Sequence, residues 1–314
     1  MKAVVCEKNS SPDPFIYREV EKPVPGDSEV LIKVHAVSLN AADYRLYRMG
    51  LGIPKNKIFG ADFTGRVEAA GKNVAMFRPG DEVAADTSDN GFGGLAEYAL
   101  APEAAVVSKP AEIPFKEAAA VPMASVTALQ ALRDFGGIKA GQRVLINGAS
   151  GGVGTYAVQL AKYFGADVTA VCSTGNVDMV RSLGADHVID YKKEDFTTSG
   201  IQYDLIIGVN GYHPLSAYKR SLASNGIFVM VGGTFPQIIK STLFGPMMSL
   251  GGKKIRVASA KSNAKDLAFI MNLVRDKKIK PVIDRVYPLE ETGKAFRYLN
   301  EGHARGKVVI TVVE

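Results

Sequence analysis

Cysteine is scarce in this 314-residue sequence, which contains Cys6 and Cys172 alone. Two cysteines cannot form a disulfide framework or a multi-cysteine zinc site, so we expect a reducing compartment and no structural metal. Histidine is also rare, and its four positions show no spacing typical of a metal site or a catalytic triad. They are His35, His187, His213 and His303.

Long apolar runs are missing too. No segment approaches the roughly 18 uncharged residues that a membrane span requires. The first residues, MKAVVCEKNSSPD, lack the apolar core and the small-residue cleavage site of a secretory signal. We therefore expect a soluble, cytoplasmic protein with no membrane partner.

Concentrated charge is the third absence. The net charge is +6, but lysine and arginine are scattered, with short clusters at 55–57, 253–254 and 275–280. Nucleic-acid binding would gather positive charge on one surface, so we expect no nucleic-acid partner. An anionic cofactor is a simpler use for part of this charge.

The chain is long enough for two domains with ordinary cores, and its patterning changes near residue 115. Before that point, short segments alternate at period two and are separated by Pro-Gly and Gly-Lys-Asn turns, which predicts an irregular, mostly antiparallel β domain. The expected strands are 29–37, 64–71, 81–86 and 95–101.

A second architecture follows a long helical pattern over 115–137. Strands rich in valine and isoleucine then alternate with helices at the spacing of βαβ units, which predicts a parallel sheet covered on both faces. The last residues return to a helix, a strand, a helix and a closing strand. The expected parallel strands are 143–147, 167–173, 187–191, 204–209, 227–233 and 254–259.

A glycine-rich loop, NGASGGVG, lies between the strand 143–147 and a helical pattern. Gly151 and Gly154 allow a tight turn and let backbone N–H groups approach a diphosphate at the positive end of the helix. Ala149 stands at the first glycine of the usual G-x-G-x-x-G motif, and Gly148 precedes it. The expected dinucleotide loop is Gly148, Ala149, Ser150, Gly151, Gly152, Val153 and Gly154.

The end of the next strand bears on which dinucleotide binds. NAD-binding proteins place an acidic residue there to accept from the ribose 2′-hydroxyl, and this sequence reads Ser173, Thr174, Gly175 and Asn176 instead. These polar side chains can donate to a 2′-phosphate, which favours NADPH over NADH. Arg181 and Lys192 are nearby charges, and the alternative role for Asn176 is to cap the following helix.

These segments together resemble the medium-chain dehydrogenase/reductase superfamily, in its zinc-independent quinone oxidoreductase branch. The segments are NGASGGVGTYAVQLAK, LGADHVIDY, AAVPMASVTALQAL and AVSLNAADYRLYRMG. The resemblance implies an α/β protein in which a GroES-like β-rich catalytic domain accompanies a Rossmann domain with a doubly wound parallel sheet. We expect the catalytic domain at 1–118, the Rossmann domain at 119–262 and a return to the catalytic domain at 263–314.

Zinc-dependent relatives carry a cysteine and a His-Glu pair as catalytic zinc ligands. The matching positions here are Asn40, Ala61 and Asp62. These residues do not form a zinc site, so no metal is expected. Without a Lewis acid, alcohol oxidation loses its main electrostatic support, and quinones or α,β-unsaturated carbonyls are the better acceptors.

The resemblance also implies roles for individual residues. Asn40 is expected near the nicotinamide, binding the acceptor oxygen, although it could instead hold a loop through backbone bonds. Tyr44 and Tyr47 are candidate proton donors, with packing as the alternative. The further cofactor contacts implied are Thr127, Tyr191, Val209, Asn210, Val231 and Gly233. Lys307, with Arg305 as its alternative, is expected to reach the cofactor phosphates.

We therefore predict an NADPH-dependent, zinc-free reductase of quinones or conjugated enones, acting on a small molecule as a homodimer. A 2-enoyl thioester or alkenal reductase is the alternative enzyme. A non-catalytic NADPH-binding regulatory protein is the alternative from another class, because it would keep the same glycine loop.

Overall fold

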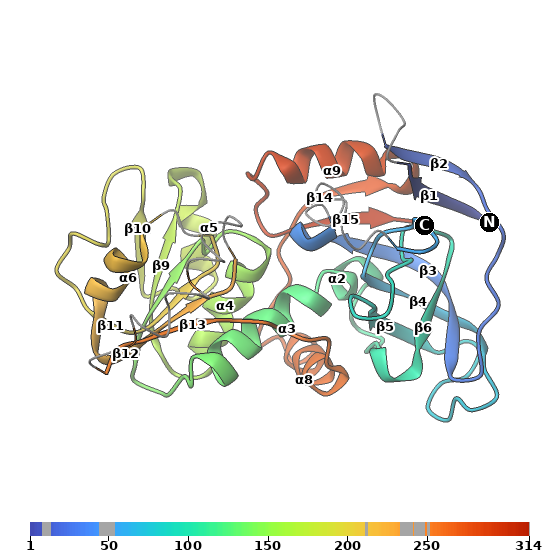
Figure 1. The fold of residues 1–314 in the computed structure, drawn as a ribbon. Helices are drawn as coiled ribbons and strands as arrows, with labels where there is room; N and C mark the ends of the chain where they lie inside the picture. The colour runs from blue at the N-terminus through green and yellow to red at the C-terminus, as the bar shows by residue number, and fades with distance from the viewer. Residues whose placement is uncertain are drawn as a thin grey trace. The chain divides into compact units, whose positions relative to one another are not determined.

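The computed structural model describes residues 1–7, 14–43, 54–210, 213–232, 241, 249 and 252–313. The chain divides into two compact units (Figure 1). Unit 1 comprises Met1–Val126 and Lys261–Glu314, and unit 2 comprises Thr127–Ala260. We keep the domain boundaries expected after residues 118 and 262 as predictions.

Unit 1 is built on a sheet with the strand order β14-β15-β3-β4-β5-β7, in which β6 also pairs with β3. Antiparallel pairing dominates, as predicted, and β14 and β15 form its parallel pair. A separate hairpin joins β1 and β2. The bounds are β1 Lys2–Cys6, β2 Phe15–Glu19, β3 Glu29–Leu39, β4 Asp62–Ala70, β5 Glu82–Asp86, β6 Tyr98–Pro102, β7 Val106–Ser108, β14 Ile283–Pro288 and β15 Lys307–Thr311.

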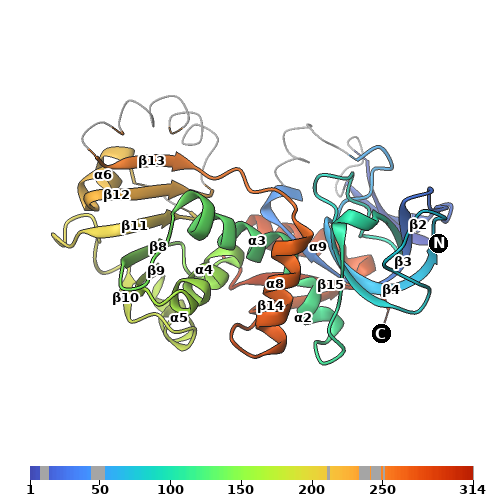
Figure 2. The same ribbon diagram turned by 90° about the horizontal axis from the view of Figure 1, so that it is seen from below.

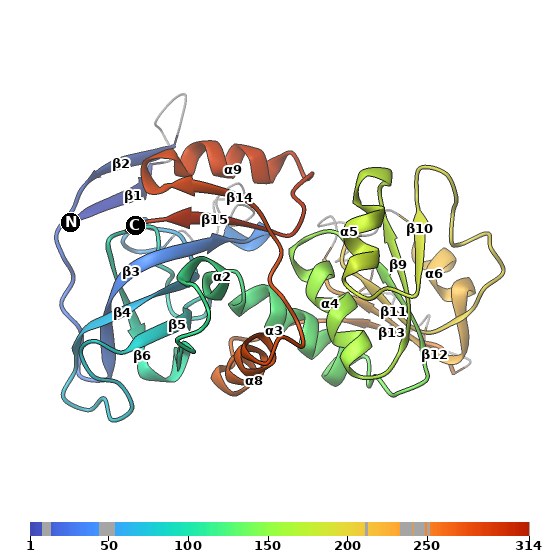
Figure 3. The ribbon, with the colours of Figure 1, turned by 180° about the vertical axis from the view of Figure 1, so that it is seen from behind.

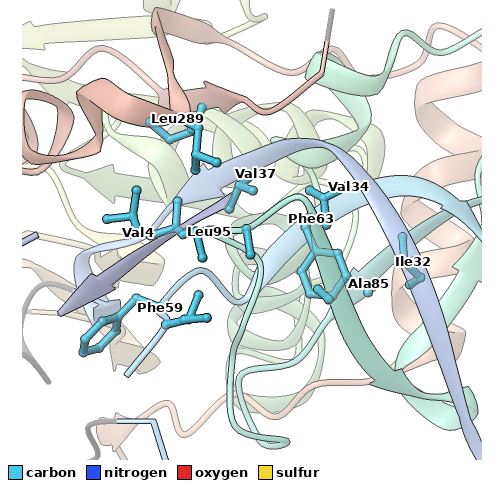
Figure 4. Packing of buried hydrophobic residues seen from close by; sticks show 14 of the residues in the cluster. Val4, Ile32, Val34, Val37, Phe59, Phe63, Ala85, Leu95 and Leu289 are labelled. Carbon is cyan, nitrogen blue, oxygen red and sulfur yellow. The ribbon is translucent and has the colours of Figure 1, made fainter. Parts of the chain in front are cut away.

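The core of unit 1 gathers apolar side chains from distant parts of the sequence. Figure 4 shows Val4 of β1, Val37 of β3, Phe59 and Leu95 from loops, and Leu289 from the C-terminal segment packed together. Each is nearly inaccessible to solvent. Burial of these side chains fixes the register of β3 against its neighbours, because a shift by one residue would expose them.

The helices of unit 1 include α2 (Phe115–Ala119), α8 (Ala264–Arg275) and α9 (Thr292–Asn300), with short 3₁₀ turns η1 (Glu103–Ala105) and η4 (Leu289–Glu291). In Figure 3, α9 runs beside β14 and β15. The helical pattern expected over 115–137 forms three helical segments: α2 ends at Ala119, and α3 (Pro122–Gln130) starts anew and continues as a π-helical turn, η2 (Ala131–Phe135). Proline lacks an N–H and suits a first helical position, so the break falls at Pro122.

Unit 2 holds a six-stranded, fully parallel sheet with the order β10-β9-β8-β11-β12-β13, which Figure 2 shows in sequence. The chain moves outward from β8 in one direction and, from β11, in the other. This is the predicted doubly wound Rossmann architecture. The bounds are β8 Arg143–Asn147, β9 Asp167–Cys172, β10 His187–Asp190, β11 Tyr203–Gly208, β12 Leu222–Met230 and β13 Lys254–Val257.

The helices of unit 2 follow the same winding. Helix α4 (Gly152–Tyr163) packs on β8 and β9, α5 (Val177–Ser182) packs on β9 and β10 after the 3₁₀ turn η3 (Thr174–Asn176), and α6 (Leu215–Ser221) packs on β12. Right-handed crossovers place α6 on the opposite face from α4 and α5. Over the described part of the chain, every helix is too short or too polar to cross a bilayer.

Candidate functional site

The glycine loop joins β8 to α4 at the carboxyl edge of the parallel sheet. Gly148 adopts a φ of +89°, a conformation that favours glycine. The amides of Gly148 and Ala149 donate to Val171 O of β9 at 3.2 and 3.0 Å, which ties the loop to the neighbouring strand. The loop is therefore a fixed element.

Gly151 and Gly154 serve the loop in different ways. A Cβ on Gly154 would lie 2.1 Å from Gly148 O, so only glycine lets the helix start beneath the loop. A Cβ on Gly151 would meet nothing closer than Gly148 O at 3.9 Å. The first N–H groups of α4, beginning at Gly152, have no carbonyl partner within the helix. Open space beside these donors fits a diphosphate.

Two further strand ends lie at this edge. The amides of Val209 and Asn210 donate to Asn147 O at 2.9 and 3.3 Å, and Val231 donates to Gly208 O at 2.9 Å. A Cβ on Gly148 would come within 3.0 Å of Asn210 N. The structure thus brings Asn210 against the glycine loop, while Gly233 lies outside the described residues.

The turn after β9 holds the residues predicted to face the ribose. Asn176 Nδ2 donates to Ser173 Oγ at 3.1 Å, and the Asn176 side chain makes no capping bond to α5. The alternative role as a helix cap is therefore not seen. Asn176 Oδ1 is buried and has no hydrogen-bond partner within the described chain. This oxygen can therefore accept a hydrogen bond from a ligand.

Sequence reasoning missed a carboxylate beside this turn. Asp190 ends β10 directly opposite Cys172 of β9, and it is buried. A hydrogen bond with the Thr174 side chain is the main reason that the pKa of Asp190 lies below its ordinary value. The amide of Lys192 also donates to Asp190 Oδ1 at 3.1 Å. Asp190 therefore anchors the turn through Thr174.

The remaining predicted cofactor residues differ in exposure. Tyr191, directly after β10, is 58% exposed, so its ring is accessible to a ligand. Thr127 is half-buried in α3. The predicted proton donors Tyr44 and Tyr47 lie outside the described residues.

Unit 1 contains a second polar cluster, at the end of β3. The register pairs Val308 of β15 with Leu39 of β3, so Lys307 lies next to Asn40 across the ladder. On the other side, Asp62 begins β4 and faces Asp86 of β5. The pairing of adjacent strands thus brings Lys307, Asn40 and Asp62 into one row across the sheet, with Asp86 beside Asp62.

The side chains in this row bond to one another. Lys307 Nζ donates to Asn40 Oδ1 at 2.5 Å and lies 3.6 Å from Asp62 Oδ2. Asn40 Nδ2 donates to Asp62 Oδ2 at 2.9 Å, and Met123 N donates to Asp62 Oδ1 at 3.1 Å. Asn40 N donates to Asp43 Oδ2 at 2.8 Å. The ammonium of Lys307, which is expected from the sequence to reach the cofactor phosphates, bonds here to Asn40 beside Asp62.

Burial governs the charges of this cluster. Asp43 and Asp62 are inaccessible to solvent, and Lys307 is 3% exposed. Burial raises the pKa of Asp62 to about 7, against the nearby Lys307 charge, and Asp86 adds to the rise. Burial likewise raises the pKa of Asp43 to about 6 and lowers that of Lys307, while the carboxylates oppose the change at Lys307. The aspartates therefore keep protons to higher pH than surface carboxyls do.

This donor set does not fit zinc. Asn40 Oδ1 and Asp62 Oδ2 already face the Lys307 ammonium, which would repel a cation between them. Across the described residues, no group of three or more His, Cys, Asp or Glu side chains is arranged to hold a metal ion.

Both units of the chain resemble known proteins. An alcohol dehydrogenase GroES-like domain model matches residues 26–111, and a zinc-binding dehydrogenase model matches 183–310. The chain is 37% identical to the chloroplast envelope quinone oxidoreductase homolog of Arabidopsis thaliana, over 93% of this chain and 92% of the relative. It is 34% identical to the mitochondrial NAD(P)H oxidoreductase RTN4IP1 of Mus musculus, over 91% and 82% of the two chains. The solved quinone oxidoreductase from Coxiella burnetii matches with a TM-score of 0.88 and 29% identity, over 99% of each chain.

Proposed function

Because the chain belongs to the medium-chain dehydrogenase/reductase superfamily, in its quinone oxidoreductase branch, we propose that it is an NADPH-dependent, zinc-free reductase of quinones or α,β-unsaturated carbonyls. It is an NAD(P)H oxidoreductase with a small-molecule substrate. The observation that carries the cofactor half of the proposal is the open space at Gly151 beside the first N–H groups of α4.

Unit 2 binds the cofactor in this proposal. The backbone donors of the loop hold the diphosphate, and the strand ends surround the nicotinamide half. The turn after β9 and the Tyr191 ring hold the adenosine ribose. The proposed contacts are Gly148, Ala149, Ser150, Gly151, Gly152, Val153, Gly154, Thr127, Ser173, Thr174, Asn176, Tyr191, Val209, Asn210 and Val231.

The preference for NADPH rests on the turn at 173–176. Ser173 and Thr174 carry hydroxyl donors, and the turn itself has no carboxylate to compete for a ribose hydroxyl. Lys192 and Lys193 follow Tyr191 and supply positive charge. Asp190 opposes a 2′-phosphate, because its carboxylate lies beside Thr174. We therefore expect a moderate preference for NADPH, which depends more on the hydroxyl groups of Ser173 and Thr174 than on a positively charged side chain.

Asn40 binds the acceptor oxygen in this proposal. The bound reduced nicotinamide supplies a hydride, and the acceptor takes that hydride and one proton, so a quinone becomes a hydroquinone. Negative charge develops on the acceptor oxygen as the hydride arrives, and an amide N–H that is already in place stabilises it. Tyr44 and Tyr47 remain the candidate donors of the proton.

Steady-state turnover tests this function. The purified protein is mixed with NADPH or NADH, and loss of nicotinamide absorbance is followed with ortho-quinones, para-quinones, enones and a 2-enoyl thioester. We expect turnover with quinones or enones and a higher kcat/KM with NADPH. Turnover confined to the thioester would favour the enoyl reductase alternative. Tight NADPH binding without turnover on any acceptor would favour a regulatory protein.

We also propose a homodimer that pairs the two parallel sheets edge to edge. β13 is the last strand on its side of the described sheet, and a second copy would pair along its outer edge. Light scattering coupled to gel filtration measures the mass directly. A mass near that of the 33.5 kDa chain would contradict the dimer.

A further inference from the structure

The orientation of the Asn40 amide is determined by its two partners. An ammonium group can only donate hydrogen bonds. Lys307 therefore identifies the Asn40 oxygen, and the atom of Asn40 that faces Asp62 is the amide nitrogen. The amide nitrogen carries two hydrogens, and one bonds to Asp62. The second has no acceptor within the described part of the chain.

Lys307 is costly to bury, which argues for a role. It is 3% exposed, and removing an ammonium from water is unfavourable unless other groups compensate. Asn40 supplies a hydrogen bond, and Asp62 lies at 3.6 Å. These two polar partners of Lys307, Asn40 and Asp62, both belong to unit 1.

We infer that Lys307 is a positioning residue of the acceptor site, which acts through Asn40. Its ammonium and the Asp62 carboxylate hold the Asn40 amide in one orientation and leave the second Nδ2–H as the donor to the acceptor oxygen. This inference rests on the proposed function and deepens it by naming what makes Asn40 specific for an oxyanion.

The charge of Lys307 also strengthens that donor. A cation at the amide oxygen draws electron density from the nitrogen, so the free N–H becomes a better donor as negative charge develops on the acceptor. An uncharged partner at position 307 would supply less polarisation. The effect is therefore larger in kcat than in the affinity for the neutral acceptor.

The test compares Lys307→Met with a matched control, Lys109→Met. Lys109 is also buried in unit 1, where it pairs with Glu82 and donates to two backbone carbonyls. Both substitutions remove a buried ammonium and should lower Tm. For Lys307→Met we expect kcat/KM for the acceptor to fall by about 10- to 100-fold, mostly in kcat, with NADPH affinity within about twofold of wild type. For Lys109→Met we expect kcat/KM to stay near wild type.

The affinity for NADPH distinguishes a Lys307 that positions Asn40 from a Lys307 that contacts the cofactor phosphates. The Kd is measured from the change in NADPH fluorescence on binding, with no acceptor present. A Lys307→Met protein that binds NADPH at least about tenfold more weakly, yet keeps kcat, would overturn the inference. It would return Lys307 to the cofactor phosphates.

A double-mutant cycle tests action through Asn40. If Lys307 acts through this amide, Lys307→Met has no further effect on kcat in an Asn40→Ala background. Additive losses would mean that Lys307 acts independently. Lys307→Gln keeps a neutral donor of similar length and replaces Lys307→Met where that variant does not fold, with an intermediate loss of kcat expected.

Wild-type turnover keeps the two proposals distinguishable. If wild type binds NADPH but reduces no acceptor, the proposed function fails whatever Lys307 does. If wild type reduces a quinone and Lys307→Met retains full kcat/KM, only the role of Lys307 fails.

Discussion

Lys307 donates a hydrogen bond to Asn40 Oδ1 at 2.5 Å, although 267 positions separate the two residues in the sequence. The pairing of β15 with β3 makes this contact, because Val308 lies opposite Leu39. A residue from the C-terminal segment thereby orients a side chain from the N-terminal one. Formation of this site accordingly depends on the docking of the last strand, β15.

We expect substitutions at the two glycines of the loop to have different effects, on cofactor binding at Gly151 and on stability at Gly154. Gly151→Val should fold, because Gly151 has a φ of −84° and a Cβ there meets nothing closer than 3.9 Å. Its side chain takes the space of the diphosphate and displaces charge-assisted hydrogen bonds, so NADPH should bind at least about tenfold more weakly. Equilibrium titration and Tm measure the two effects. Unchanged NADPH affinity would remove the phosphate-loop assignment.

Gly154→Ala is the matched substitution. Its Cβ would lie 2.1 Å from Gly148 O, so the loop or the start of α4 must move. We expect a loss of stability of about 1–3 kcal/mol or more, from overpacking. Urea unfolding measures it. A stability equal to that of wild type would show that the loop rearranges easily.

Cofactor preference is tested at the turn after β9. Ser173→Glu places a second carboxylate beside Asp190 and the expected 2′-phosphate. Like-charge repulsion should weaken NADPH binding by about 10- to 100-fold and NADH binding by less than about threefold. Ser173→Gln is the neutral control of similar size. Equal losses for both cofactors would place the 2′ site elsewhere.

Local pattern predicted the parts of the fold that are set by local sequence. The valine-rich segments became β8 to β13, and the glycine loop lies between β8 and α4 as expected. The row of Asn40, Asp62 and Lys307 was not predicted as a unit, because strand register brings these residues together and no local spacing reports it. Asp190 was missed for the same reason, since it reaches Thr174 from the neighbouring strand.

Metal content tests the proposed zinc-free chemistry. Asn40, Ala61 and Asp62 offer no soft or imidazole ligand, and Lys307 places a positive charge among them. Elemental analysis of the purified protein should therefore find much less than one zinc per chain, and dialysis against a chelator should leave turnover unchanged. One firmly bound zinc per chain, lost together with activity, would contradict the mechanism.

Asp43 should make stability fall as pH rises. Its folded pKa is about 6, above the ordinary 3.8, because burial outweighs the hydrogen bonds from Asn40 and Gly60 and the charge of Lys307, while Asp86 adds repulsion. Between these values the folded state holds a proton that the unfolded state releases, so the free energy of unfolding declines with pH and levels off above the folded pKa. The full effect is about 3 kcal/mol.

Asp43→Asn removes this titration and keeps an oxygen that can accept from Asn40 N. Relative to wild type, the variant should gain about 2–3 kcal/mol of stability between about pH 4 and about pH 7. Urea unfolding of both proteins across that range measures the difference, and the titrations of Asp62 and Asp86 are common to both. A difference in stability that does not change with pH would mean that Asp43 is ionised over the whole range. The hydrogen bonds and the Lys307 charge would then stabilise its carboxylate by at least as much as burial destabilises it.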